Sequence, residues 1–224
     1  MSSASCKSAE GGMPAFLQAL RRTGTSPQDP PSVRLQGVLD RTRDQLGPTQ
    51  RAHLTTHAQY VCKMAMRLGK ALSMDAADLE RLHLAGLCHD LGKFLIPERV
   101  LAKRAPLSQE EKTLVGRHAS DGAEMATMLG ADPTTADYIR YHHARFDGAG
   151  SKDGVRGKAI PLGARILTVA DALVTMTSWR PYQPTHSFTG ALRELRRGGG
   201  LQFDPDVVDA VPQALLSDVP SSSR

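Results

Sequence analysis

The sequence repeats apolar residues at three- and four-residue steps along most of its length. This spacing places apolar side chains on one face of an α-helix, whereas a half-buried strand would need alternation with a period of two, which is nearly absent here. One such stripe consists of His57, Val61, Met64, Leu68 and Leu72. We therefore expect an all-α fold.

Local signals divide this pattern into about seven helices. Ser108 with Glu111 three residues later is a capping box, and Pro133 after Asp132 is typical of a first helical turn. Glycines at positions 92 and 198–200 are placed to end helices. The expected helices cover roughly residues 57–72, 76–91, 108–125, 133–143, 162–177 and 187–197, with a last one from residue 205.

The two ends of the chain differ from this pattern. The first 35 residues contain 13 Gly, Pro or Ser, a composition that disfavours a packed core. We expect a flexible N-terminal arm at residues 1–32, one helical domain at residues 33–217 and a disordered tail at residues 218–224.

Charge and cysteine content exclude several classes of protein. A formal net charge of +5 over 224 residues suits a small anionic ligand and falls short of a DNA- or RNA-binding protein with a concentrated basic face. No apolar run approaches the length of a membrane span. Three cysteines without a C-x-x-C pair are typical of a reducing compartment, so we expect a cytoplasmic protein.

Asp171 lies in the middle of the otherwise apolar helix expected at residues 162–177. A buried carboxylate is costly unless a cation pairs with it, and no Lys or Arg follows it at i+3 or i+4. Histidines also fall on the apolar faces of the expected helices, at His57, His89, His118, His142 and His143. A divalent metal would satisfy the carboxylate and the imidazoles together.

His89 and Asp90 are adjacent at an expected helix end. Asp90 has two oxygens and can bridge two ions, and such a pair of ions can assist phosphoryl transfer. Mixed nitrogen and oxygen ligands suit Fe, Mn, Co, Ni or Zn better than Ca or Mg. Lys93, one turn on, could then offer a charge to a phosphate. Against this, a single buried histidine is usually a hydrogen-bonded core residue, so only the whole set points to metal.

The set resembles a known family in both order and spacing. It covers roughly residues 50–215, and its motifs are His89-Asp90-Leu91-Gly92-Lys93, Ile96-Pro97, His118, His142-His143-Ala144-Arg145-Phe146-Asp147-Gly148, Ile160-Pro161-Leu162, Asp171, Arg180-Pro181-Tyr182 and Phe203-Asp204-Pro205. This pattern is similar to the HD-GYP family of HD-domain metal-dependent phosphohydrolases. The resemblance implies a single HD-type helical bundle with a metal site in its core.

The resemblance also implies a site and an activity. It implies two divalent transition metals, Fe or Mn, and hydrolysis of cyclic di-GMP to pGpG and in some members to GMP by a hydroxide that bridges them, with Asp90 and Lys93 as catalytic residues. Another signalling protein, such as a diguanylate cyclase, is the kind of partner expected. The metal ligands carried over are His57, His89, Asp90, His118, His142, His143 and Asp171.

Two further sets of residues are less strongly constrained. His53 stands where some family members place a carboxylate for a third metal, so it is either a ligand of a third ion or a histidine that binds none. Residues 140–165 carry six Lys or Arg against two Asp, which fits substrate binding or an ordinary solvated surface. The expected substrate contacts are Lys93, Arg145, Lys152 and Arg180.

Three departures from the family concern substrate rather than metal. The Gly-Tyr-Pro signature is degenerate and reads Gly150-Ser151-Lys152, and the second Asp of a D-x-x-D pattern is Val174. Gln183 replaces a basic residue. Two alternatives to a cyclic di-GMP phosphodiesterase therefore stay open: a catalytically weak sensor of cyclic di-GMP, and a phosphohydrolase for another cyclic nucleotide or dinucleotide.

Overall fold

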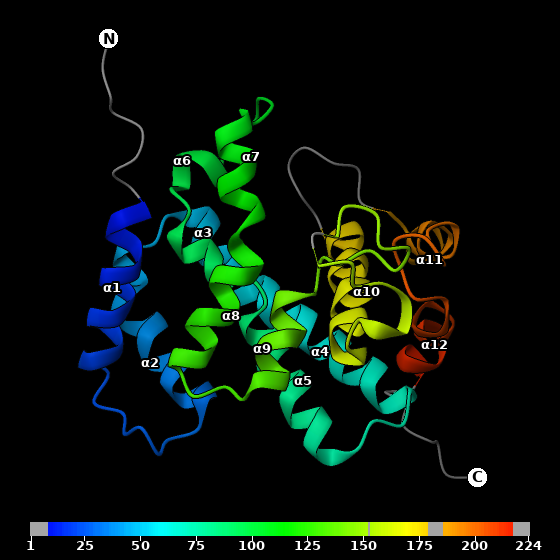
Figure 1. Ribbon diagram of the computed structural model, residues 1–224, viewed down its shortest axis with the longest axis horizontal. Coiled ribbons are helices and arrows are strands. Elements are labelled where there is room, and N and C mark those ends of the chain that lie inside the picture. The colour runs from blue at the N-terminus through cyan, green and yellow to red at the C-terminus, as the bar shows by residue number, and fades with distance from the viewer. Residues whose placement is uncertain (1–8, 152, 179–185, 217–224) are drawn as a thin grey trace.

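The computed structural model describes residues 9–151, 153–178 and 186–216 and confirms an all-α fold (Figure 1). No strand occurs among these residues. The α-helices are α1 (Ala9–Arg22), α2 (Pro31–Thr42), α3 (Pro48–Ala52), α4 (Ala58–Ala71), α5 (Ala76–Cys88), α6 (Glu98–Leu101), α7 (Gln109–Gly116), α8 (His118–Met128), α9 (Pro133–Arg140), α10 (Leu162–Thr177), α11 (Phe188–Arg197) and α12 (Pro205–Leu216). Short turns of other helix types are η1 (Arg43–Gln45), η2 (His53–His57), η3 (Leu91–Leu95) and η4 (Gly157–Ala159).

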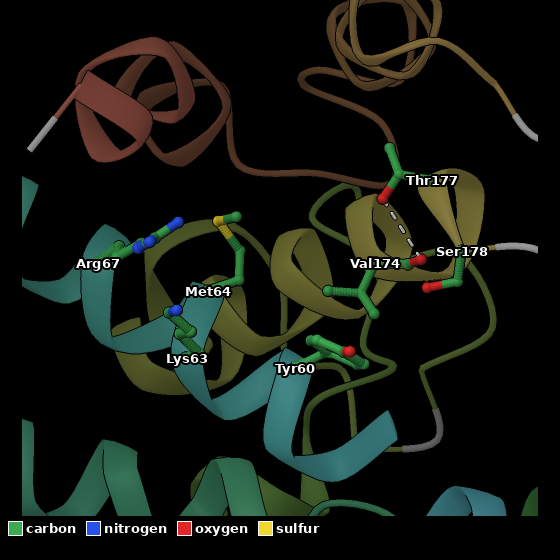
Figure 2. Close-up of a pocket in the computed structure, with 7 residues that line it drawn as sticks. All are labelled: Tyr60, Lys63, Met64, Arg67, Val174, Thr177 and Ser178. Carbon is green, nitrogen blue, oxygen red and sulfur yellow. Dashed lines mark hydrogen bonds between the residues drawn. The ribbon is translucent and has the colours of Figure 1, made fainter. Parts of the chain in front are cut away.

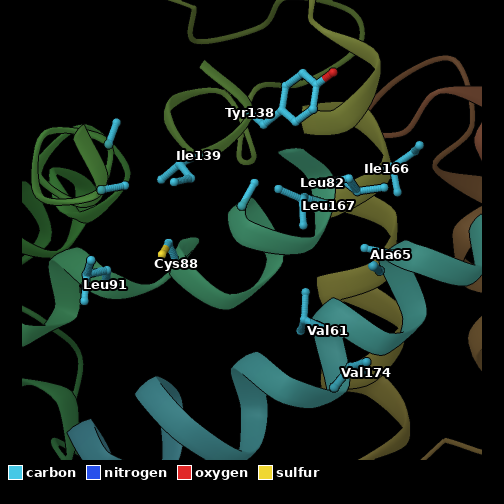
Figure 3. Close-up of a cluster of buried hydrophobic side chains, with 14 of the residues drawn as sticks. Val61, Ala65, Leu82, Cys88, Leu91, Tyr138, Ile139, Ile166, Leu167 and Val174 are labelled. Carbon is cyan, nitrogen blue, oxygen red and sulfur yellow. The ribbon is translucent and has the colours of Figure 1, made fainter. Parts of the chain in front are cut away.

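The core lies where α4, α5, α9 and α10 pack together (Figure 3). Side chains from each of these helices are buried in it, among them Val61, Leu82, Ile139 and Leu167. The helices α8 and α12 pack against this group, on α9 and on α4 respectively. Because the histidines lie at or next to the ends of these packed helices, the core holds the site in a fixed geometry.

Helix α1 corrects the expected N-terminal arm. Its Phe16 is fully buried and meets Phe94 edge to face, with ring centroids 5.9 Å apart. Burying a phenylalanine contributes roughly 1.5–3 kcal/mol, which offsets the poor helix-forming composition nearby. Residues 9–22 are therefore part of the folded domain, and the next helix already begins at Pro31. The tail expected at residues 218–224 lies outside the described residues.

The described residues contain twelve α-helices rather than about seven, because one expected helix is divided and four helices, α1, α2, α3 and α6, were not expected. The helix expected over residues 108–125 is interrupted at Arg117, which separates α7 from α8. Other signals hold. Ser108 accepts a hydrogen bond from the backbone of Glu111 at 3.2 Å, and α10 has the bounds expected for it. Among the described helices, none combines the length and the apolarity needed to cross a bilayer.

Candidate metal centre

Histidines and carboxylates from five parts of the chain meet at the centre of the molecule. They come from the turn before α4, the turn after α5, the first residue of α8, the turn after α9 and the middle of α10, which lie together in Figure 1. The residues brought together are His53, His57, His89, Asp90, His118, His142, His143 and Asp171. Apart from His53, they are the residues that the sequence led us to expect as metal ligands.

A close approach of two backbones brings Asp90 to His118. A Cβ atom at Gly92 would lie 2.1 Å from the carbonyl oxygen of His118, so only glycine lets η3 pack this tightly on α8. As a result His118 Nε2 lies 3.5 Å from Asp90 Oδ1. Gln50 supports η3 from the other side, since its Nε2 donates to the carbonyls of Phe94 and Ile96 at 3.2 and 2.9 Å.

The turn η2 is a single π-helical turn, a form that is rare and often found at functional sites. It carries His53 at its start and His57 at its end, with ring centroids 5.4 Å apart. His57 Nε2 lies 3.0 Å from Asp171 Oδ1, whereas His53 Nδ1 lies 3.1 Å from Asp90 Oδ2. One turn of the chain thus presents two imidazoles to two different carboxylates.

Three imidazoles are oriented by backbone carbonyls three residues before them. The Nδ1 atoms of His89, His118 and His142 lie 2.9, 2.6 and 2.6 Å from the carbonyl oxygens of Gly86, Val115 and Ile139. A carbonyl oxygen can only accept, so each Nδ1 carries the hydrogen and each neutral ring leaves a lone pair on Nε2. This is the arrangement found when a histidine ligates a metal through Nε2. These contacts with carbonyl oxygens were not expected from the sequence. The only sequence feature they share is that each carbonyl belongs to the residue three positions before the histidine.

Two of these lone pairs accept no hydrogen bond within the described structure. His89 Nε2 and His142 Nε2 are buried and make no hydrogen bond there. An unsatisfied buried polar atom costs about 1–3 kcal/mol, which a metal ligand bond would remove. The Nε2 atoms of His118 and His143 lie 3.0 Å apart. Two nitrogens bound at about 2.1 Å and at right angles to one ion would be separated by about this distance.

Burial lowers the pKa of four of the six imidazoles, and the two carboxylates of the cluster stay ionised. Burial and the neighbouring His118 lower the pKa of His143 to about 4, and burial lowers the pKa of His118 as well. Burial alone would raise the pKa of Asp90, but His89, the contact with His53 and Lys93 hold it well below its usual value. The pKa of Asp171 is likewise lowered, mainly by its hydrogen bond with His57, against the effect of burial. Neutral imidazoles with ionised carboxylates are the protonation states that bind divalent cations.

The donor atoms form three groups, each within 4.8 Å. One group is His118, His142 and His143, and a second is His57, His89 and Asp171. The third contains His53, His57 and Asp90. The carboxylate of Asp90 links them, because Oδ1 faces His118 at 3.5 Å while Oδ2 faces His89 at 3.5 Å and His57 at 3.8 Å. The residues present therefore fit divalent metal ions bound around Asp90.

Lys93 lies beside this carboxylate. Its Nζ is 2.7 Å from Asp90 Oδ2 and 3.2 Å from His53 Nδ1, and its side chain is largely buried. A cation at this place balances part of the negative charge of the site. A third ion between His53 and Asp90 would have to displace the Lys93 ammonium.

The other expected substrate contacts do not join the cluster in the described structure. Arg145 forms a two-pronged ion pair with Asp147, with distances of 3.0 and 2.6 Å. Lys152 and Arg180 lie outside the described residues. His83 and His186, which are not in the expected ligand set, are exposed.

A pocket next to the cluster was not anticipated from the sequence. It has a volume of about 370 Å³ and lies between α4 and α10 (Figure 2). The residues that line it are Tyr60, Lys63, Met64, Arg67, Val174, Thr177 and Ser178. The spacing of Lys63 and Arg67, four residues apart on one helix, is the signal that could have indicated it.

Comparison with known proteins agrees with this geometry. A family model described as an HD domain matches residues 44–207. The chain is 32% identical over 156 residues to the 3'3'-cGAMP-specific phosphodiesterase 1 of Vibrio cholerae, covering 69% of this chain and 36% of that protein. It is 35% identical over 148 residues to the cyclic di-GMP phosphodiesterase response regulator RpfG of Xanthomonas campestris pv. campestris, covering 64% of this chain and 39% of that protein. The chain therefore spans less than half the length of these relatives.

A solved structure shares the fold. Bd1817 from Bdellovibrio bacteriovorus, described as an HDG"Y"P protein, aligns over 92% of this chain and 64% of its own, with a TM-score of 0.59 and 18% identity. At this level of identity the likeness concerns the arrangement of helices.

Proposed function

Because this chain belongs to the HD-domain family, in its HD-GYP branch, we propose that it is a metal-dependent phosphodiesterase that hydrolyses cyclic di-GMP to pGpG. One observation carries the proposal. Six oriented or paired imidazoles and two ionised carboxylates surround a buried centre, and two of the imidazole nitrogens there make no hydrogen bond in the described structure.

The ligands proposed for two divalent transition metals, Fe or Mn, are those derived above. Their nitrogen and oxygen donors favour such ions over Ca or Mg. When bound, two ions of this kind supply Lewis-acid activation of water and neutralise charge on the phosphoryl group. The ligand set is His57, His89, Asp90, His118, His142, His143 and Asp171.

Asp90 and Lys93 are the residues proposed to act in the reaction. Asp90 holds the two halves of the cluster together, since its oxygens face different histidines. Lys93 Nζ, 2.7 Å from Asp90, carries a fixed positive charge at the edge of the same centre. A phosphodiester oxygen that meets this ammonium would gain a charge-assisted hydrogen bond that strengthens as negative charge develops.

The relatives favour a second candidate substrate beside cyclic di-GMP. One similar protein is named for 3'3'-cGAMP and another for cyclic di-GMP, and both molecules are cyclic dinucleotides with two phosphodiesters. We place the enzyme in the cytoplasm, which the free state of both described cysteines supports. A diguanylate cyclase or other signalling protein remains a proposed partner.

The proposal is tested with protein loaded with Mn or Fe and supplied with cyclic di-GMP or 3'3'-cGAMP. Linear product should form and should vanish in Asp90→Ala, whereas Asp209→Asn, which changes an exposed carboxylate on α12, should behave like the wild type. Tight binding of cyclic di-GMP without product would instead identify a sensor. Turnover of 3'3'-cGAMP alone would identify a phosphodiesterase whose substrate is 3'3'-cGAMP and not cyclic di-GMP.

A further inference from the structure

The pocket between α4 and α10 begins one helical turn from the metal centre. His57, just before α4, meets Asp171 of α10 with Nε2 and Oδ1 3.0 Å apart. Tyr60 and Val174, which line the pocket, each lie three residues further along the same helices. Residues three apart are neighbours on a helix surface, so pocket and centre share one face of each helix.

The charged residues that line the pocket are cationic, and no lining residue carries a carboxylate. Of the seven described lining residues, Lys63 and Arg67 are positively charged, Thr177 and Ser178 carry hydroxyl groups, and none is acidic. Lys63 and Arg67 are four residues apart on α4, so their side chains extend from neighbouring positions. Helical side chains also lean towards the N-terminus of their helix, which here is the end that carries His57. This wall suits an anion at the end of the pocket beyond Tyr60, as seen from the metal centre.

The remaining walls are apolar or aromatic. Tyr60 has 59% of its surface exposed, and Met64 lies on the same helix. In Figure 2, Lys63 and Arg67 lie at one end of the pocket, whereas Tyr60 lies at the other end with Val174 and Ser178. An exposed aromatic ring beside a cationic end is the combination that binds a nucleobase by stacking and its phosphate by charge.

The volume limits what the pocket can take. About 370 Å³ is near the lower end of the roughly 300–1,000 Å³ range of small-molecule sites. One nucleotide unit fits such a space better than a whole cyclic dinucleotide does.

We propose that this pocket binds the nucleotide unit of the substrate that is not being cleaved. Lys63 and Arg67 bind its phosphate, and Tyr60 and Met64 pack against its base. The inference rests on the proposed function, because the other phosphodiester of the same molecule is then at the metal centre. Binding in this pocket would give the enzyme a higher affinity for dinucleotides than for simple phosphodiesters.

The test compares two substrates and one binding probe. Cyclic di-GMP has a second nucleotide, bis(p-nitrophenyl) phosphate has none, and GMP serves as the binding probe. The variants are Lys63→Ala, the double variant Lys63→Ala with Arg67→Ala, and Tyr60→Ala with Tyr60→Phe as its partner that keeps the ring. Lys70→Ala is the matched control, because Lys70 is an exposed lysine of α4 that does not line the pocket. Metal content and circular dichroism check that each variant is folded.

The double variant and Tyr60→Ala should each raise KM for cyclic di-GMP and Kd for GMP by about tenfold, the order expected for lost phosphate contacts or base stacking. Their hydrolysis of bis(p-nitrophenyl) phosphate should stay within about twofold of the wild type, as should all values for Lys70→Ala and Tyr60→Phe. Because Arg67 makes other interactions, Lys63→Ala alone should show a smaller change in the same direction.

Unchanged KM and Kd in the double variant and in Tyr60→Ala would overturn the inference, and so would a parallel loss of activity on both substrates. A wild type that cleaves bis(p-nitrophenyl) phosphate but no cyclic dinucleotide would contradict the proposed function. In that case the Kd for GMP still tests the role of the pocket. A Kd in the double variant equal to that of the wild type would overturn the inference that the pocket binds a nucleotide.

Discussion

His118 and His143 face each other across the centre of the molecule with their Nε2 atoms 3.0 Å apart. The hydrogen of His118 is held on Nδ1 by the carbonyl of Val115 at 2.6 Å, so its Nε2 presents a lone pair to its neighbour. Burial lowers the pKa of both rings, and a neutral His143 with its hydrogen on Nε2 can donate to this lone pair. A shared metal ion would replace this hydrogen bond, and it would also give a ligand bond to the Nε2 atoms of His89 and His142, which make no hydrogen bond in the described structure.

The stability of the metal-free protein should depend on pH because of these buried imidazoles. The pKa of His143 falls from 6.5 to about 4 on folding, so the unfolded chain binds a proton at a pH where the folded chain does not. Stability is therefore fully present above about pH 6.5 and is lost as the pH falls towards 4, by up to a few kcal/mol for the cluster. Urea unfolding with chelator at several pH values measures it. Equal stability at pH 7 and pH 5 would contradict the buried, neutral state of these rings.

Gly92→Ala should disrupt the site without touching a ligand. The new Cβ would lie 2.1 Å from the carbonyl oxygen of His118, so η3 must move away from α8 and carry Asp90 with it. We expect a loss of at least about 1–3 kcal/mol in unfolding free energy together with reduced metal content. Gly116→Ala is the control, because a Cβ there has no atom within 4 Å. Normal metal content in Gly92→Ala would show that this close approach is not needed.

Lys93→Met should lower the reaction rate without lowering metal binding. The variant keeps most of the side-chain volume but loses the ammonium that lies 2.7 Å from Asp90 Oδ2. We expect kcat for cyclic di-GMP to fall by about 10²-fold, the effect of removing one charge-stabilising group, while two metals remain bound. Steady-state kinetics and metal analysis on one preparation provide both values. Wild-type kcat in this variant would remove Lys93 from the reaction.

Phe16→Ala tests the packing of α1 on the rest of the domain. Phe16 is fully buried and its ring meets that of Phe94, so truncation should cost about 3 kcal/mol in unfolding free energy. Val33→Ala, on the neighbouring helix α2 and 49% exposed, should cost far less. A change below about 0.5 kcal/mol in Phe16→Ala would restore the view of the N-terminal region as a flexible arm.

Much of the fold follows from local signals in the sequence. The helix at residues 162–177 has an apolar pattern bounded by Pro161, and the capping box at Ser108 forms as expected. The meeting of these histidines with Asp171 was predictable because imidazoles and a carboxylate on apolar faces need a common partner. Those signals are contained in single helices or in the spacing of a motif.

The rest depends on contacts between distant segments. The burial of Phe16 requires Phe94, which the Gly-, Ser- and Pro-rich composition near residue 16 does not indicate. The histidine Nδ1 atoms and Gln50 Nε2 bond to backbone carbonyls, and a carbonyl acceptor has no residue signature in the sequence. The pocket beside the centre likewise arises only when α4 meets α10.

The most direct measurement is the metal content of protein purified without oxygen, with the ions located by anomalous scattering. The account predicts two Fe or Mn ions per chain, one beside His118, His142 and His143 and one beside His57, His89 and Asp171. It also predicts that His142→Ala lowers the content while the exposed His83→Ala does not. A centre that holds no metal after loading with any of these ions would contradict the account.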